Sequence, residues 1–387
     1  MSEQIPQTNH PEKDEGLKVI ITGGAGCIGF ATIKSLLKHH PNASIHVLDL
    51  TIPSLEVYPF SNFQEKKNQL HFYKADITSP TSLSAVFDAV RPQAVIHTAS
   101  IIPSAARKRQ LNNEGLWKVN VEGTRNILDI AERTEEVKAL VYTSSCDAVK
   151  PDSWMDFVNA TESSTQHLRD TDIKGWDNGA KAAAETLVLS SDLRIKTCAI
   201  RTHGVVGTLD QNLFPLVATS PRKISLGSGK NLYDFTSADN VGLAHVLAMN
   251  NLLGLSSTNK DREEKESANR RAFFITDGNP KPFRELQEMI WRVVDDDDPE
   301  ASYAKYTVIP VWLFKGILKI AGLFTKATIS PVEVGDAVSM RYYDIGEARR
   351  VLGYRPEGNK GLEESMRDAS EWWKMSSMSI SAKGGKK

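Results

Sequence analysis

The sequence has little of several features that would indicate particular classes of protein. Its 387 residues include only three cysteines, Cys27, Cys146 and Cys198, which lie far apart without the paired spacing of a metal site. Such a pattern is typical of reduced thiols in a reducing compartment. The net charge is -1, so no basic excess indicates a nucleic-acid partner. We therefore expect an ordinary soluble globular protein with no metal site and no bound nucleic acid.

Long apolar runs are also missing, which excludes a transmembrane helix of roughly 18–20 apolar residues. The nearest candidate, residues 308–324, is interrupted by Pro310, Lys315 and Lys319. Its two lysines lie on one side of an otherwise apolar helix, so it is either an interfacial helix on a membrane or a packed lid helix. The polar segment 1–16 lacks the apolar core of a secretory signal. We expect it to be a disordered arm, and residues 376–387 to be a disordered tail.

Short apolar runs alternate with helical segments through the first half of the chain. Strands that are covered by helices on both faces are almost continuously apolar, and these runs have that composition. Right-handed crossovers would wind such strands and helices into one sheet. The runs are LKVIITG, SIHVLDL, LHFYKAD, AVIHTAS, ALVYTSS and KTCAIRT. The predicted fold class is therefore α/β, a Rossmann-type doubly wound parallel sheet.

The alternation weakens after Gly207, which indicates a second, smaller region. We expect residues 17–207 to form the Rossmann domain, with residues 231–250 returning to it. Residues 208–375 are expected to form an interleaved C-terminal region that binds substrate or closes over it as a lid.

A glycine-rich loop joins the first predicted strand to the first predicted helix. Gly23 permits a tight turn, Gly26 lets the backbone approach a pyrophosphate, and Gly29 lets helix and strand pack closely. The helix N-terminus at Cys27 and Ile28 supplies N–H donors and a positive potential. Spaced glycines alone are a weak signal, but here a strand, a helix and a downstream acid accompany them. The loop therefore predicts a dinucleotide-binding site.

The downstream acid is Asp49, which closes the second predicted strand. A carboxylate at this position can accept hydrogen bonds from both adenosine ribose hydroxyls and would repel a 2′-phosphate. The next residues, Leu50 and Thr51, offer no cation to such a phosphate. The expected cofactor is therefore NAD rather than NADP.

Several motifs in this order and spacing resemble the extended short-chain dehydrogenases. The resemblance is greatest to the branch of 3β-hydroxysteroid dehydrogenases and sterol-4-alpha-carboxylate 3-dehydrogenases (decarboxylating), and it runs from about Lys18 to Trp373. The motifs are TGGAGCIG, KADIT, VIHTAS, NVEGTRNIL, VYTSS, KAAAETLVL, DFTSADNVGLAHVLA, FFITDGNPKPF and LGYRPEGNKGLEESM.

This resemblance implies roles for single residues. Asp76 would accept a hydrogen bond from the adenine amino group, with Ile77 packing nearby, and Ala99 would lie beside the cofactor ribose. Asn120 would hold the strand around the site, although a helix cap is an equal alternative. Ser145 would hydrogen-bond the substrate oxygen at the carbon that gains or loses hydride.

The resemblance also implies a tyrosine four residues before Lys181, where the sequence has Asp177. In the family, the lysine binds the ribose and lowers the pKa of the tyrosine, which then takes the alcohol proton. No tyrosine occurs between Tyr142 and Tyr233. Asp177 is either a first-turn acid paired with Lys181 or a substitute base. The third alternative is a proton carrier from elsewhere, such as water, Tyr233 or His203.

The leading interpretation is an NAD-dependent oxidoreductase with Ser145, Asp177 and Lys181 as catalytic residues. Its substrate would be a secondary alcohol or ketone of a hydrophobic polycyclic compound, namely a sterol, terpenoid or polyketide of steroid or secondary metabolism. Because the tyrosine is missing, a non-redox isomerase, lyase or cyclase and a cofactor-sensing binding protein stay open. A cytoplasmic location, peripheral contact with the endoplasmic reticulum membrane through residues 308–324, and a homodimer are further expectations.

Overall fold

The computed structural model describes the chain from residue 16 to residue 384 with several gaps. The described ranges are 16–102, 105–106, 109–150, 154–165, 179–255, 266–296, 298, 303, 305–314 and 331–384. The expected N-terminal arm and most of residues 308–324 lie outside these ranges.

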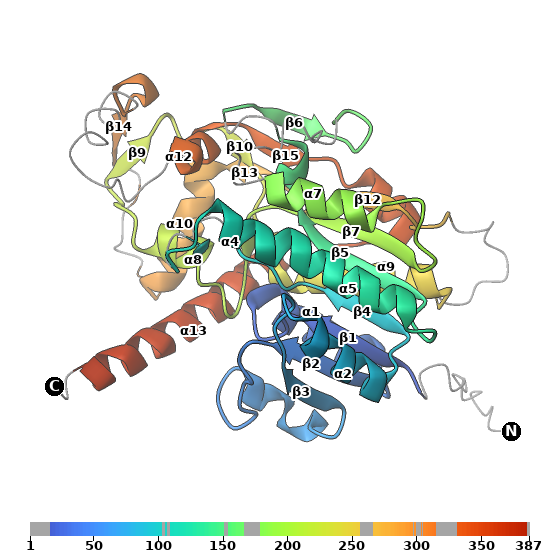
Figure 1. Cartoon of the computed structure of the whole chain (residues 1–387). Helices are drawn as coiled ribbons and strands as arrows, with labels where there is room; N and C mark the ends of the chain where they lie inside the picture. The colour runs from blue at the N-terminus through green and yellow to red at the C-terminus, as the bar shows by residue number, and fades with distance from the viewer. Residues whose placement is uncertain are drawn as a thin grey trace, which may run out of the picture.

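The central element is a seven-stranded sheet in the order β12-β7-β5-β4-β1-β2-β3 (Figure 1), and every pairing in it is parallel. Its strands are β1 (Lys18–Thr22), β2 (Ser44–Asp49), β3 (Leu70–Lys74), β4 (Ala94–His97), β5 (Ala139–Ser145), β7 (Lys196–Thr202) and β12 (Arg271–Ile275). All six apolar runs of the sequence form strands of this sheet. The predicted doubly wound α/β fold is confirmed, with the strand order reversing between β1 and β4.

Alternate residues of each strand face opposite layers of helices, because side chains in a strand point to the two faces in turn. Val19 and Ile21 of β1 belong to one buried cluster and Ile20 to another. The first face is covered by α1 (Cys27–His39) and α9 (Ala238–Leu253), and the second by α2 (Pro80–Val90), α5 (Gly123–Arg133) and α7 (Gly179–Val188). Helices on both faces explain why the strands read as continuous apolar runs.

Two segments of the second half of the chain belong to this layered unit. Helix α9 packs along α1 on one face of the sheet, and it includes residues 238–250 of the range 231–250 that the sequence analysis expected to return to this unit. Strand β12 adds a seventh strand beside β7, although its residues lie in the range expected to form the substrate-binding region. The sequence run RAFFI is as apolar as the other strands, but its pairing partner lies some seventy residues earlier in the sequence.

The remaining elements form a second region, whose labels lie above and to the left of the sheet in Figure 1. A four-stranded sheet has the order β13-β10-β15-β6, and two pairs, β11-β8 and β14-β9, stand beside it. Its strands are β6 (Phe157–Ala160), β8 (Val205–Val206), β9 (Ile224–Leu226), β10 (Leu232–Tyr233), β11 (Thr236–Ser237), β13 (Lys281–Pro282), β14 (Thr307–Ile309) and β15 (Arg341–Tyr343). Its helices are α8 (Leu213–Ala218), α10 (Phe283–Val294), α12 (Pro331–Val338) and α13 (Asn359–Gly384). Phe214, Trp291 and Met366 lie in a core that α8, α10 and α13 share.

Short helices complete the described part of the chain. They are η1 (Phe60–Lys66), α4 (Asn113–Trp117), η2 (Lys118–Glu122), η3 (Cys146–Val149) and η4 (Ala348–Leu352). The C-terminal helix α13 continues to Gly384, whereas the sequence analysis expected a disordered tail from residue 376. Residues 376–383 contain no proline or glycine, so nothing in the chain interrupts the helix there. None of the helices among the described residues combines the length and apolar character that crossing a bilayer requires.

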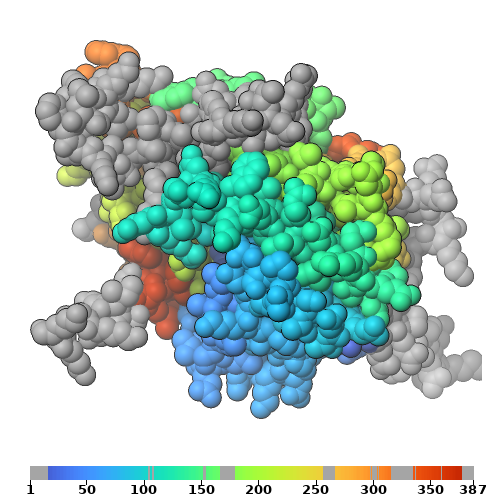
Figure 2. Space-filling model, viewed as in Figure 1, coloured from blue at the N-terminus to red at the C-terminus, as the bar shows by residue number. Residues whose placement is uncertain are grey.

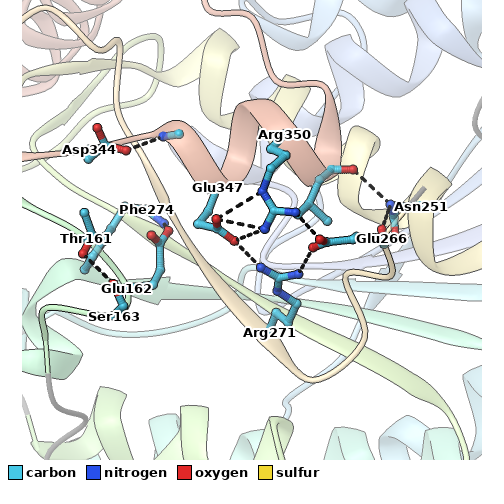
Figure 3. Close-up of polar contacts among 12 residues, drawn as sticks. Thr161, Glu162, Ser163, Asn251, Glu266, Arg271, Phe274, Asp344, Glu347 and Arg350 are labelled. Carbon is cyan, nitrogen blue, oxygen red and sulfur yellow. Dashed lines mark hydrogen bonds and ion pairs between the residues drawn. The ribbon is translucent and has the colours of Figure 1, made fainter. Parts of the chain in front are cut away.

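The outer edge of the sheet is covered by charged side chains (Figure 3). Arg271 of β12 pairs with Glu266 at 2.7 Å and also with Glu347. The carboxylate of Glu162, just after β6, accepts a hydrogen bond of 2.7 Å from the backbone N–H of Phe274. The Glu162 contact thus occupies one backbone N–H of an edge strand that would otherwise offer unpaired backbone groups to another chain.

Helices α1 and α9 approach each other closely at Gly242. A Cβ atom at this position would lie 2.5 Å from the backbone oxygen of Ala31 in α1, so only glycine fits without a backbone shift. The two helices carry much of the apolar layer on their face of the sheet, and their spacing therefore supports the β1–α1 loop.

We predict that Gly242→Ala destabilises the protein, although glycine to alanine in a helix ordinarily gains about 1 kcal/mol. Overpacking should cost about 1–3 kcal/mol in the free energy of unfolding, measured by urea denaturation. Gly115→Ala in α4 is the matched control, because the nearest atom there is the movable Leu111 side chain at 3.2 Å. A Gly242→Ala protein as stable as the unmutated one would contradict the prediction.

Candidate active site

The carboxyl ends of the parallel strands meet at one edge of the sheet, and most of the predicted site residues lie there. Gly23 follows β1, Asp49 ends β2, Ala99 follows β4 and Ser145 ends β5. In open α/β sheets, ligands bind outside this edge at the point where the strand order reverses. The fold therefore places these residues along this edge, on both sides of the point between β1 and β4 where the strand order reverses.

The glycine loop has the close approaches that its sequence predicts. Gly23 has a φ of +72°, and a Cβ there would lie 2.7 Å from the backbone of Ala99. A Cβ on Gly29 would lie 2.3 Å from the carbonyl oxygen of Gly23. The first glycine thus permits the turn against the strand end of β4, and the third permits the helix to start directly over the loop.

The N-terminus of α1 follows the glycine loop at the same edge of the sheet. Gly26 is the N-cap, and no side chain caps the helix. The first helical residues, Cys27 and Ile28, therefore present their N–H groups without competition from a capping oxygen. Together with the glycine cradle, this arrangement fits a dinucleotide pyrophosphate.

Asp49 lies beside the loop. One oxygen of its carboxylate accepts from the N–H of Ala25 at 3.1 Å, and the other accepts from the N–H of Thr51 at 3.3 Å. The side chain is partly exposed, so its remaining acceptor capacity faces outward. This geometry fits an acceptor for ribose hydroxyls.

Asp76 and Ile77 follow β3 along the same edge. Asp76 is exposed, and its carboxylate accepts from the N–H and the hydroxyl of Thr78 at 2.8 and 2.9 Å. Ile77 is buried against α5, where a Cβ on Gly123 would come within 2.7 Å of its side chain. The structure thus brings both residues to the β3 end of this edge.

A chain of buried hydrogen bonds runs behind the loop. The hydroxyl of Thr22 contacts Nδ1 of His97 at 2.6 Å, and Nε2 of His97 contacts the hydroxyl of Thr124 at 3.0 Å. Because Thr124 donates to the carbonyl of Asn120, it accepts from His97, which assigns the proton to Nε2. Burial lowers the pKa of His97 to about 3, so the ring is neutral.

Asn120 ends this chain and holds the segment that follows β4. Its side chain accepts from the N–H of Ile101 and donates to the carbonyl of Ile101, both at 2.8 Å. It lies within the π-helical turn η2 and caps no helix. The structure therefore favours the holding role over the capping role.

Lys181 of α7 reaches the end of β5. Its ammonium donates to the carbonyl of Thr143 at 2.7 Å and lies 5.0 Å from the ring centre of Tyr142. Burial lowers the pKa of Lys181 to about 7, although Glu185 acts in the opposite direction. The lysine and Ser145 thus lie at the same end of one strand.

One buried ionic network was missed by the sequence analysis. Glu185 of α7 accepts from the hydroxyl of Ser144 at 2.5 Å and pairs with Arg201 of β7 at 2.5 Å. Glu185 has no exposed surface, and Arg201 is also buried. The available signal was a glutamate on the apolar side of the predicted helix, one turn after Lys181.

Ser145 has its hydroxyl engaged by Asp147, two residues later. The hydroxyl oxygen accepts from the N–H of Asp147 at 3.1 Å, and the hydroxyl donates to its carboxylate at 3.3 Å. Asp177 lies outside the described residues, so its position relative to Ser145 and Lys181 stays a prediction.

His203 and Tyr233 are two alternative proton carriers that the sequence offers in place of the tyrosine. Nδ1 of His203 donates to the carbonyl of Asp234 at 2.9 Å, and its ring packs on Tyr233 at 4.5 Å. Burial, together with the positive charge of Arg341, lowers the pKa of His203 to about 3. A ring that stays neutral near pH 7 is a poor proton carrier there. Among the described residues, no group of three or more histidine, cysteine, aspartate or glutamate side chains could hold a metal ion.

Solved structures with the same fold include nucleotide-sugar epimerases. A UDP-glucose 4-epimerase from Stenotrophomonas maltophila with bound NAD is 18% identical, with a TM-score of 0.66, and the match covers 94% of this chain and 99% of that one. The UDP-Glc/GlcNAc 4-epimerase of Campylobacter jejuni is 20% identical, with the same TM-score of 0.66, covering 93% and 100%. At these identities the likeness shows the fold alone.

Sequence relatives have a higher identity to this chain than these solved structures. The decarboxylating sterol-4-alpha-carboxylate 3-dehydrogenase of Candida albicans is 31% identical over 368 residues, which cover 92% of this chain and 97% of that protein. The human enzyme of the same name is 26% identical over 376 residues, covering 92% and 90%. The sequence model of the 3-beta hydroxysteroid dehydrogenase/isomerase family matches residues 20–305. The chain therefore belongs to the 3-beta hydroxysteroid dehydrogenase/isomerase family.

Proposed function

We propose that this protein is an NAD-dependent dehydrogenase that acts on a secondary alcohol or ketone of a sterol. The main observation behind this proposal is that three features lie at one edge of the sheet. They are the glycine loop, which leads into a helix without a side-chain cap, Ser145 and Lys181. Family membership supports the reaction class, and the relatives' names specify sterol-4-alpha-carboxylates. Neither source favours the non-redox or cofactor-sensing alternatives.

NAD, when bound, would supply the hydride acceptor or donor. Gly23, Gly26 and Gly29, with the amides of Cys27 and Ile28, would hold its pyrophosphate. Asp49 would accept the adenosine ribose hydroxyls. Asp76 and Ile77 would line the adenine site, and Ala99 would lie beside a ribose.

Lys181 and Ser145 would act at the reacting end of the cofactor. Lys181, already held on the carbonyl of Thr143, would bind ribose hydroxyls. Ser145 would hydrogen-bond the substrate oxygen. Asp177 stays in the proposal as one candidate for the proton acceptor, because it takes the place of the family's tyrosine.

The direct test is turnover of a 4α-carboxylated sterol with NAD, followed by NADH absorbance and by mass spectrometry of the product. NADH formation together with an oxidised sterol is the expected result. Product without NADH would support a non-redox enzyme, and cofactor binding without product would support a sensing protein.

Cofactor choice follows from Asp49. Calorimetry should show that NAD binds more tightly than NADP, because the carboxylate would face the added phosphate. Asp49→Ala should narrow the difference, mainly by removing that repulsion. Equal affinities in the unmutated protein would refute the assignment.

Lys181→Ala should lower both NAD affinity and kcat, the latter by a factor on the order of 10²–10⁴, because it removes the ribose ligand and the local positive charge. Calorimetry and NADH formation measure the two effects. Lys196→Ala is the control, since this lysine is exposed at the opposite end of β7. Unchanged NAD affinity in Lys181→Ala would exclude the ribose role.

We further propose that residues 308–324 make peripheral contact with a membrane, as on the endoplasmic reticulum, in a protein that is otherwise cytoplasmic. The described part of this segment supports it, because Val308, Trp312 and Leu313 are large apolar side chains exposed by 47%, 73% and 43%. Exposed aromatic and aliphatic groups favour the headgroup region of a membrane.

A homodimer also stays a proposal, to be tested by analytical ultracentrifugation.

Trp312→Glu should reduce binding to phosphatidylcholine vesicles in a flotation assay, because it replaces the most exposed aromatic group with a charge. Trp117→Glu is the matched control, since Trp117 is 40% exposed on α4. Equal flotation of both variants and the unmutated protein would argue against this contact.

A further inference from the structure

An ionic cluster lies directly behind Ser145, at the point where β5 passes into η3. One oxygen of the Asp147 carboxylate accepts from Arg341 of β15 at 3.1 Å and lies 3.7 Å from the ammonium of Lys150. Both cations are buried, with side chains 1% and 0% exposed, whereas Asp147 is 28% exposed. The carboxylate is therefore held from behind by positive charge and keeps access to solvent.

The other oxygen of Asp147 accepts the hydrogen bond from Ser145. A serine hydroxyl has one proton to donate and two lone pairs to accept with. Asp147 takes the proton through its carboxylate and one lone pair through its N–H. One lone pair of the Ser145 hydroxyl is therefore left to accept a further hydrogen bond, and the residue is only partly buried. Toward a ligand, Ser145 is thus an acceptor of hydrogen bonds.

Capping alone does not account for this arrangement. Ser145 does cap the short helix η3 through its contact with the N–H of Asp147. That contact needs neither the carboxylate of Asp147 nor an arginine from β15. Bringing charged side chains into the interior is costly, so a one-turn helix is a weak reason for the cluster.

We propose that Asp147 is a positioning residue that orients Ser145 as an acceptor and receives its proton, so that the pair accepts the proton of the substrate alcohol. The inference rests on the proposed dehydrogenase function. The substrate O–H bond breaks as its proton moves to Oγ of Ser145, and the original hydroxyl proton of Ser145 moves to the Asp147 carboxylate. The carbinol C–H bond breaks with its electron pair, which leaves as hydride to NAD, and the C=O bond forms. The proton then leaves from Asp147 to solvent.

This orientation favours oxidation of an alcohol over reduction of a ketone, because a ketone offers no proton to an accepting serine. The contact of 3.3 Å between Ser145 and Asp147 is long, as catalytic hydrogen bonds often are before a ligand binds. The relay also gives the enzyme a proton acceptor that does not depend on Asp177.

Several charged groups act on Asp147. Burial raises its pKa, but the positive charges of Arg341 and Lys150, together with the hydrogen bond from Ser145, outweigh this effect and hold the pKa below its ordinary value. The ring of His203 also lies nearby and is neutral at working pH. Cys146 and Asp234 also lie in the cluster. A base must be ionised to accept a proton, so turnover should be present above this low pKa and lost as pH falls through it.

The experiment measures kcat against pH with NAD and a 4α-carboxylated sterol. Asp147→Asn should lower kcat on the order of 10²-fold, leave the KM for NAD unchanged and remove the acidic limb of the profile. Asp147→Glu should restore part of kcat and the limb. Asp156→Asn is the matched control, because Asp156 accepts from the N–H of Met340, next to Arg341, and has no contact with Ser145. It should keep kcat and the profile.

A double variant tests whether Asp147 acts through Ser145. Ser145→Ala combined with Asp147→Asn should lose no more activity than the worse single variant. Losses that multiply, or an Asp147→Asn protein with kcat within about twofold of the unmutated one, would overturn the proposal.

A second measurement does not require turnover. Carbon-13 NMR of labelled aspartates should show that the pKa of Asp147 rises in Ser145→Ala, because a hydrogen bond to the ionised carboxylate is lost. An unchanged pKa would show that Ser145 does not donate to Asp147 and would overturn the relay. If the unmutated protein formed no NADH from any sterol, the proposed function would fail, and this titration would still decide the Ser145–Asp147 coupling.

Discussion

The buried carboxylate of Glu185 joins three elements on which the candidate active site depends. It accepts from Ser144 of β5 and pairs with Arg201 of β7, while its own backbone belongs to α7. Removing one partner of a buried ion pair typically costs 3–5 kcal/mol, since the other charge stays buried. Lys181 lies one helical turn before Glu185, so its contact with the carbonyl of Thr143 depends on the position of α7 against β5. The position of Lys181 relative to Ser145 therefore depends on an interaction that joins α7 to β5 and β7.

Charge is distributed unevenly around this junction. The imidazoles of His97 and His203 are buried and neutral, so they provide directed hydrogen bonds without a charge to solvate. Charge is gathered instead at Asp147 with Arg341 and Lys150, where one carboxylate reaches solvent. Proton transfer at the end of β5 can thus reach water without charging the buried polar chain behind the loop.

Much of the fold could be predicted because its causes are local. Each of the six apolar runs forms a strand, because a strand that is buried on both faces is almost continuously apolar in sequence. β12 is apolar in the same way, but its pairing with β7 depends on a crossover connection that the composition of the strand does not indicate. The helix that continues to Gly384 was missed because a polar segment was interpreted as disordered, although nothing in it breaks a helix.

The turn of the glycine loop could be predicted from the sequence because a φ of +72° or a close backbone approach admits few residue types. Asn120 was narrowed to two roles, and the structure chose between them by placing its amide against Ile101. The Ser145–Asp147 cluster could not be predicted, because Arg341 lies 194 residues from Asp147 along the chain. The sequence by itself determined the turn of the glycine loop, since a positive φ is a constraint on a single residue. The tertiary structure alone decided which charges surround Ser145, because ionic contacts act between side chains that only packing brings together.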